Sequence, residues 1–238
     1  MFFIIDKKRL VLISTFILII ITLIGTITTK ALKRMIALEM LVVIDAGHGE
    51  PDGGCVGSLG TIEQEINLSV AKKTAEILEA KNINTLMTRN NSLGLWTEKS
   101  TTIRQKKVED MKKRVEIMNK SHSDLFISIH MNSYPNSSTQ GLRIFYDRNH
   151  EEIKELAESI QDRMSDVTGA KTSQVKPADR TLFLLKNTPM PAILIECGFL
   201  SNPQEENRLK SSQYQAKLAW AIADAIEKYF LQLRINQK

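Results

Sequence analysis

One uncharged apolar segment, residues 10–29, limits what this chain can fold into. Its twenty residues, LVLISTFILIIITLIGTITT, lie between basic residues at 7–9 and at 30–34. A helix rises about 1.5 Å per residue, so this segment would span about 30 Å, the thickness of a bilayer's hydrocarbon core. We therefore expect residues 1–39 to form an N-terminal membrane anchor with one transmembrane helix, and residues 40–238 to form a folded domain.

An apolar segment of this length also fits a buried core helix or a cleaved signal peptide. A buried core helix would need a polar stripe, and the segment offers only Ser14 and scattered threonines. A cleaved signal peptide usually has a shorter apolar region and a small-residue cleavage site, whereas TTKALKRM follows here. An uncleaved anchor is favoured, and a cleaved signal peptide stays the alternative. Three basic residues flank the segment on each side, so charge does not determine its orientation.

The distribution of charge argues against a nucleic-acid partner. The formal net charge is +5, but residues 1–39 alone hold six basic and two acidic side chains. The remaining 199 residues hold 26 basic and 25 acidic side chains and are nearly neutral. A nucleic-acid-binding protein would carry a basic face on its folded domain. The basic character belongs mainly to the flanks of the apolar segment.

From residue 41 onward the hydrophobic period alternates between that of strands and that of helices. We expect strands near 41–44, 83–88, 125–130, 142–146, 181–185 and 192–197, and helices near 63–81, 102–120, 153–167 and 213–233. This alternation predicts a three-layer α/β domain with a mainly parallel twisted sheet flanked by helices. Sheets of this kind place their sites at the carboxyl ends of the strands.

Polar residues that could carry chemistry lie at those strand ends. His48 follows the first strand in a glycine-rich loop, and His130 closes LFISIH. Glu196 ends a buried strand, where an uncompensated carboxylate is costly and its pKa rises toward that of a working acid or base. Glu63 and Glu65 open the first helix, where acids also suit the helix dipole. Two histidines and a glutamate are a sensible zinc ligand set.

The other two histidines and the two cysteines have simpler interpretations. His122 and His150 lie at element boundaries in polar surroundings, so we expect both at the surface. We expect Cys55 and Cys197 to be free packing thiols, with a disulfide or a cysteine nucleophile as lesser alternatives. Two cysteines in 238 residues exclude a disulfide scaffold and a cysteine-rich structural zinc site.

Four motifs in order carry a family resemblance. IDAGHGEPDGG, IEQEINLSVA, LFISIHMNS and PAILIECGFLSNPQE are similar to segments of the zinc-dependent N-acetylmuramoyl-L-alanine amidases of the family 3 type. The similarity runs from about residue 42 to the end of the chain. The stretch TTIRQKKVEDMKKRVEIMN, together with the short apolar N-terminus, most resembles the spore-cortex amidases of endospore-forming bacteria, which act in cortex maturation through muramic-lactam formation.

The resemblance implies a role for each matching residue. His48, Glu63 and His130 would bind Zn²⁺, and Glu196 would be the catalytic acid or base. Ala46 stands where the family usually has proline, and Gln64 stands where lysine is common, so Glu65 stays an alternative ligand. Residues 40–238 would be the zinc amidase catalytic domain.

The resemblance also implies a substrate and a location. Peptidoglycan would be the substrate, and because it lies outside the cell membrane, a single-pass chain would hold its catalytic domain on the extracytoplasmic side. An activating partner protein is a further expectation, although the sequence does not identify it. The alternatives are a zinc carboxypeptidase or endopeptidase on wall peptides, with Arg143 or Arg180 clamping a carboxylate, and a non-catalytic wall-binding protein.

Overall fold

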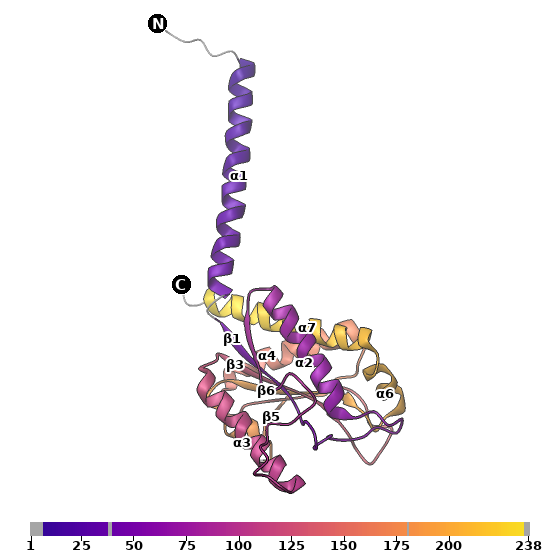
Figure 1. The fold of residues 1–238 in the computed structure, drawn as a ribbon. Coiled ribbons are helices and arrows are strands. Elements are labelled where there is room, and N and C mark those ends of the chain that lie inside the picture. Colours follow the sequence, from indigo (N-terminus) through magenta and orange to yellow (C-terminus); the bar gives the residue numbers. More distant parts are fainter. Residues whose placement is uncertain (1–6, 38–39, 180, 236–238) are drawn as a thin grey trace. The chain divides into compact units, whose positions relative to one another are not determined.

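The computed structural model describes residues 7–37, 40–179 and 181–235. The chain divides into two units, Met1–Glu39 and Met40–Lys238. The first contains helix α1, Lys7–Ala37 (Figure 1). The large apolar side chains of α1 between Leu12 and Ile24 are exposed. Among the described residues, no helix combines the length and the hydropathy of a membrane span.

The second unit is an α/β domain built on a six-stranded sheet in the order β2-β1-β3-β6-β4-β5. The strands are β1 (Leu41–Ala46), β2 (Asn84–Met87), β3 (Leu125–Asn132), β4 (Arg143–Tyr146), β5 (Lys176–Pro177) and β6 (Ala192–Phe199). Strands β2, β1, β3 and β6 are parallel, whereas β4 is antiparallel to β6 and β5 is parallel to β4. The sheet is therefore mixed: the expected parallel part comprises the four strands from the β2 edge to β6, and β4 and β5 lie beyond it at the other edge.

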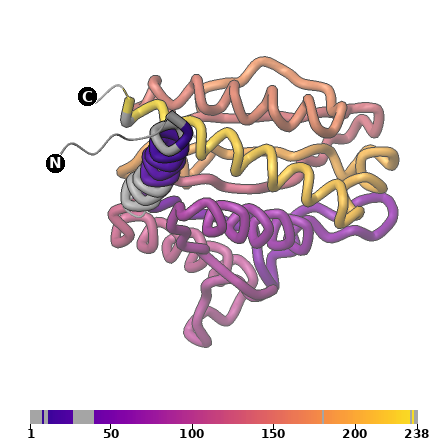
Figure 2. The backbone as a smooth tube through the Cα atoms, turned by 90° about the horizontal axis from the view of Figure 1, so that it is seen from above, coloured from indigo at the N-terminus to yellow at the C-terminus, as the bar shows by residue number. Residues whose placement is uncertain are grey.

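Helices cover both faces of the sheet. On one face α2 (Glu63–Ala80), α7 (Ser212–Ile235) and α4 (Lys154–Thr168) lie side by side (Figure 2). On the other face lies α3 (Ile103–Ser121) (Figure 1), and the short α5 (Phe183–Lys186) packs beside it. The remaining helical segments are η1 (Glu151–Ile153) and α6 (Pro203–Leu209). The three layers match the architecture expected from the sequence.

Local signals explain where several helices begin and end. Thr102 and Gln105 form a capping box at the start of α3, which satisfies backbone N–H groups that have no partner within the helix. Helix α4 ends at Gly169, whose φ of 67° lies in the left-handed region. The side chain of Asn202 accepts hydrogen bonds at the start of α6, where proline occupies the first turn. Sequence reasoning missed this short helix.

The central strands form the core and determine where the site lies. Almost every residue of β1, β3 and β6 is buried, as expected for parallel strands with helices on both faces. Their long apolar runs explain why these strands were readily predicted. The carboxyl ends of β1, β3 and β6 meet at one edge of the sheet, and the loops that follow them carry polar side chains.

The strand predicted over 181–185 is wrong. In the structure Phe183–Lys186 forms α5, and Lys176–Pro177 pairs with β4 at the edge of the sheet instead. Leu184 and Leu185 are both buried in one apolar cluster on the α3 side. Neighbouring side chains on a strand point to opposite faces, so burial of consecutive leucines on one side favours a helical turn.

Candidate metal centre

Three of the predicted site residues meet at the carboxyl edge of the sheet. His48 lies two residues beyond β1, His130 lies near the end of β3, and Glu63 is the first residue of α2. Gly47 permits this approach, because a Cβ atom at that position would overlap the His130 ring. His48 itself adopts a positive φ of 62°, which turns its side chain back toward the sheet edge.

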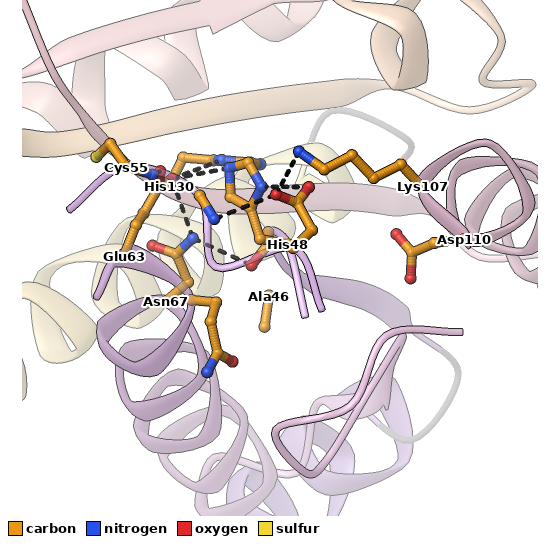
Figure 3. Close-up of polar contacts among 12 residues, drawn as sticks. Ala46, His48, Cys55, Glu63, Asn67, Lys107, Asp110 and His130 are labelled. Atoms are coloured by element: carbon orange, nitrogen blue, oxygen red, sulfur yellow. Dashed lines mark hydrogen bonds and ion pairs between the residues drawn. The ribbon is translucent and has the colours of Figure 1, made fainter. Parts of the chain in front are cut away.

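The distances among these side chains are short enough for a shared metal ion. Oε1 of Glu63 lies 3.2 Å from Nε2 of His48 and 3.1 Å from Nδ1 of His130. The two imidazole rings are nearly perpendicular, with centroids 5.0 Å apart. One ligand atom from each residue lies within 4.8 Å of the others (Figure 3). Two imidazoles and one carboxylate fit a three-ligand catalytic zinc site.

The surroundings of Glu63 keep its carboxylate ionised. The backbone N–H groups of Cys55 and Met131 donate to it over 2.9 and 3.2 Å, and the amide of Asn67 donates over 3.2 Å. Burial acts to raise its pKa, but hydrogen bonds and charge from the two histidines lower the pKa well below its usual range. Glu65, the alternative ligand, is exposed one residue beyond the buried Gln64.

A carboxylate orients the His48 ring from its other side. Oδ2 of Asp52 lies 2.9 Å from Nδ1 of His48, and Lys107 forms an ion pair of 2.7 Å with Asp52. Burial acts to lower the pKa of His48, yet the carboxylates of Asp52 and Glu63 raise the pKa to about 9. Such a partner fixes which ring nitrogen faces a metal. Sequence reasoning missed Asp52, four residues after His48 in GEPDGG.

Glu196 lies next to His130 across the sheet, because the two residues are register partners in the β3–β6 pair. Its Oε2 atom is enclosed and has no hydrogen-bond partner among the described residues. Burial raises the pKa of Glu196 to about 7; the charge of Glu63 adds to the rise, and the two histidines oppose it. A carboxyl group with this pKa can both accept and release a proton near neutral pH.

A cavity of about 270 Å³ opens beside the two histidines, between α3 and the α5 segment. Its polar side includes His48, His130, Asp52 and Lys107. The apolar part of its lining consists of Met111, Leu182, Phe183, Leu184, Leu185 and Leu194. The combination of an apolar wall and a few convergent polar groups is typical of a substrate site.

Glu206 holds the loop that leads into Glu63, and sequence reasoning missed this role. Its fully buried carboxylate accepts hydrogen bonds from the Ser58 hydroxyl at 2.9 Å and from the backbone N–H groups of Leu59 and Thr61 at 3.0 and 3.2 Å. Burial acts to raise its pKa, but these hydrogen bonds lower the pKa overall. In the sequence, the only sign of this loop-holding role is that Glu206 is the second acid of the NPQEE stretch.

The remaining candidate residues lie elsewhere or play other parts. His122 ends α3 in the left-handed region, and His150 lies 2.6 Å from Asp147. Both cysteines are free, although Cys55 contributes its backbone N–H to Glu63. The guanidinium of Arg143 lies over the Phe199 ring, with 5.6 Å to its centroid. Position 180, the other arginine considered for carboxylate binding, falls outside the described residues.

Fold and site together define a class: an α/β domain with a two-histidine, one-carboxylate cluster suited to metal-assisted hydrolysis. The family model described as N-acetylmuramoyl-L-alanine amidase matches residues 42–228. The chain therefore belongs to the N-acetylmuramoyl-L-alanine amidase family, which is a family of hydrolases.

Individual relatives agree with this assignment. The germination-specific N-acetylmuramoyl-L-alanine amidase of Bacillus subtilis is 35% identical over 190 residues, which cover 80% of this chain and 79% of the relative. The CwlD amidase of Clostridioides difficile, solved in complex with the GerS lipoprotein, is 37% identical with a TM-score of 0.77 and covers 82% of this chain and 100% of its own. The CwlV catalytic domain of Bacillus (Paenibacillus) polymyxa var. colistinus is 31% identical, with a TM-score of 0.69. The match covers 80% of this chain and 97% of the CwlV domain.

Proposed function

We propose that this chain is a zinc-dependent amidase that hydrolyses the bond between N-acetylmuramic acid and L-alanine in peptidoglycan. The observation that carries the proposal is the convergence of His48, Glu63 and His130 in a chain of this family. These three residues would hold the ion and leave a fourth position open for water or substrate. When bound, zinc would polarise the scissile carbonyl and lower the pKa of a water molecule to about 7.

Glu196 would move the proton that hydrolysis requires. Its carboxylate accepts a proton from the attacking water and then delivers it to the nitrogen of L-alanine as the amide bond breaks. The pKa of about 7 supports both steps near neutrality. Asp52 would keep the His48 ring in the ligating orientation through the 2.9 Å contact with its Nδ1 atom.

We place the domain outside the cell membrane, where peptidoglycan lies, with residues 1–39 as the anchor. Support comes from the twenty uncharged residues at 10–29 and from the exposed apolar side chains of α1. Similarity to the germination-specific amidase supports a role in the spore cortex. The C. difficile relative was solved in complex with a lipoprotein, which supports a partner protein for this chain.

Zinc analysis and product analysis test the activity. The purified full-length chain should contain about one zinc ion, and the His48→Ala/His130→Ala double variant should contain none and be inactive. Mass spectrometry of digested peptidoglycan should show stem peptides with a free L-alanine amino group. Release of C-terminal amino acids instead would identify a carboxypeptidase. Stoichiometric zinc in the double variant would contradict the proposed site.

Protease treatment of intact protoplasts tests the location. If the chain is anchored by its N-terminus with residues 30–238 outside, added protease should remove the catalytic domain from a membrane-bound, uncleaved chain. Lysed protoplasts provide the control for protease sensitivity. Full protection of the domain in intact protoplasts would place it in the cytoplasm, where it would not meet peptidoglycan.

A further inference from the structure

Buried side chains hold three successive backbone carbonyls, from the last residue of β1 into the loop that carries His48. The carbonyl of Ala46 accepts from Arg89 and Arg114, each at 2.9 Å. The carbonyl of Gly47 accepts from Arg89 at 2.9 Å and from Asn67 at 3.1 Å, and that of His48 accepts from Arg114 at 2.5 Å. All three donor side chains are buried. The loop conformation is therefore fixed from beneath the site.

The Gly47 carbonyl is also where this loop is joined to the start of α2. The Nη2 group of Arg89 donates to the carbonyl of Gly47 and, at 2.9 Å, to that of Gln64, the neighbour of Glu63. The amide nitrogen of Asn67 donates to the Gly47 carbonyl and, at 3.2 Å, to Oε1 of Glu63 (Figure 3). Both side chains thus connect the segment of one metal ligand to the segment of another.

The His48 loop needs such external support. A residue other than glycine at φ 62° is in a sparsely populated conformation, which persists only when its surroundings hold it. Gly47 has no room for a side chain beneath the His130 ring. Because Gly47 has no side chain to pack, the loop cannot be fixed there by side-chain packing. Hydrogen bonds to its backbone carbonyls fix it instead.

Asparagine at position 67 costs stability, so a purely structural role does not explain it. It is fully buried, and its Oδ1 atom has no hydrogen-bond partner among the described residues. A buried polar atom without a partner is destabilising, and an apolar side chain of similar shape would avoid that cost. What an apolar residue could not supply is the N–H₂ group that reaches the Gly47 carbonyl and Glu63 at once.

We propose that Asn67 and Arg89 are positioning residues that fix the spacing between His48 and Glu63 and thereby set the affinity of the site for its metal. This inference rests on the proposed zinc site. Neither residue would touch the substrate or the metal. Groups that orient metal ligands in this way typically contribute about 10–100-fold to metal affinity.

The test compares Asn67→Leu with Gln215→Leu in the full-length protein. Gln215 is a matched control, because it is also a buried amide: it donates to the Leu209 carbonyl at 2.8 Å and accepts from Ser69 at 2.7 Å. Zinc affinity is measured by competition with a chromophoric chelator, and the thermal midpoint is measured without metal. Asn67→Leu should bind zinc about 10–100-fold more weakly. Gln215→Leu should retain the affinity of the unchanged protein.

Each other outcome has a definite meaning. Unchanged zinc affinity in folded Asn67→Leu would overturn the positioning role, as would an equal loss in Gln215→Leu. If Asn67→Leu does not fold, Arg89→Lys answers the same question, because lysine keeps the charge but cannot reach three carbonyls at once; unchanged affinity there would overturn the proposal. Failure of the unchanged protein to bind zinc would instead contradict the proposed metal site.

Discussion

Glu63 and Glu196 lie at one edge of the sheet, yet the protein surrounds the two carboxylates in opposite ways. Glu63 accepts hydrogen bonds from two backbone N–H groups and one amide. Burial acts to raise its pKa, but the hydrogen bonds and charges of the two neighbouring imidazoles lower the pKa well below its usual range. Glu196 has an enclosed oxygen atom without a partner, and burial raises its pKa to about 7. Two glutamates at one site thus differ: Glu63 is held as an anion, whereas the pKa of Glu196 lies near neutral pH.

The difference follows from the elements that carry the two residues. Glu63 begins α2, where the positive end of the helix dipole favours an anion, and the backbone N–H groups that reach its carboxylate come from Cys55 in the preceding loop and from Met131 in β3. Glu196 lies near the end of a central strand, whose N–H groups are already used by neighbouring strands. Carboxylates with separated pKa values are a common basis for dividing a binding role from an acid–base role.

The largest effect expected from this comparison is on turnover. Glu196→Gln should lower kcat by about 10²–10⁴-fold, because the amide cannot accept the proton of water. Its zinc content should stay that of the unchanged protein, since the comparison gives Glu196 no ligating role. Amino groups released from peptidoglycan measure turnover, and elemental analysis measures zinc. Loss of zinc from this variant would show that both carboxylates bind the metal and would break the comparison.

The next effect concerns metal binding by the other carboxylate. Glu63→Gln should weaken zinc binding by more than about 100-fold, because even groups one step removed from a metal contribute about 10–100-fold. Glu65→Gln is the matched control, since it makes the same change at an exposed position in the same helical turn. Chelator competition measures both variants. Zinc loss in Glu65→Gln with retention in Glu63→Gln would reverse the assignment of the ligand.

How much of this site could be predicted depends on how each residue is positioned. His48, His130 and Glu196 lie near or just beyond the carboxyl ends of apolar strands, so the parallel sheet itself brings them to one edge. Their separate roles came from the family resemblance, because spacing alone does not distinguish a metal ligand from an acid or base. The choice between Glu63 and Glu65 depends on which side of a helix faces the sheet. That choice came only from the family resemblance, and the structure supports it by burying Glu63 and exposing Glu65.

Other contributions could not be read from the sequence in advance. Asn67 and Arg89 act through backbone carbonyls, and any residue type presents a carbonyl, so no motif marks the contact. The segment 181–185 misled because a short apolar run fits a strand or a helical turn equally well. The buried runs that formed β1, β3 and β6 had no such ambiguity, and for this reason the fold was predicted better than the partners of the site.

The smallest effect is on the stability of the metal-free protein, and its sign depends on pH. The folded protein raises the pKa of Glu196 from 4.5 to about 7, so the folded state binds this proton more tightly than the unfolded state does. Ionisation of Glu196 therefore destabilises the folded state. This loss of stability is absent below pH 4.5, the pKa in the unfolded chain, and it grows as the pH rises through 7. At pH 8 it should be on the order of 2 kcal/mol, allowing for partial exposure of the side chain.

Glu196→Gln removes that ionisation and should therefore change the pH dependence of stability. Its free energy of unfolding, relative to the unchanged protein, should rise by on the order of 2 kcal/mol between pH 4.5 and pH 8. Urea unfolding of both proteins in the presence of chelator measures this difference, and Glu65→Gln corrects for the chemical change itself. The test depends on how the difference in free energy of unfolding changes with pH. Burying the new amide changes that difference by an amount that is the same at every pH. A difference that stays flat with pH would mean that Glu196 is solvated much as in the unfolded chain, and the contrast with Glu63 would then lose its electrostatic basis.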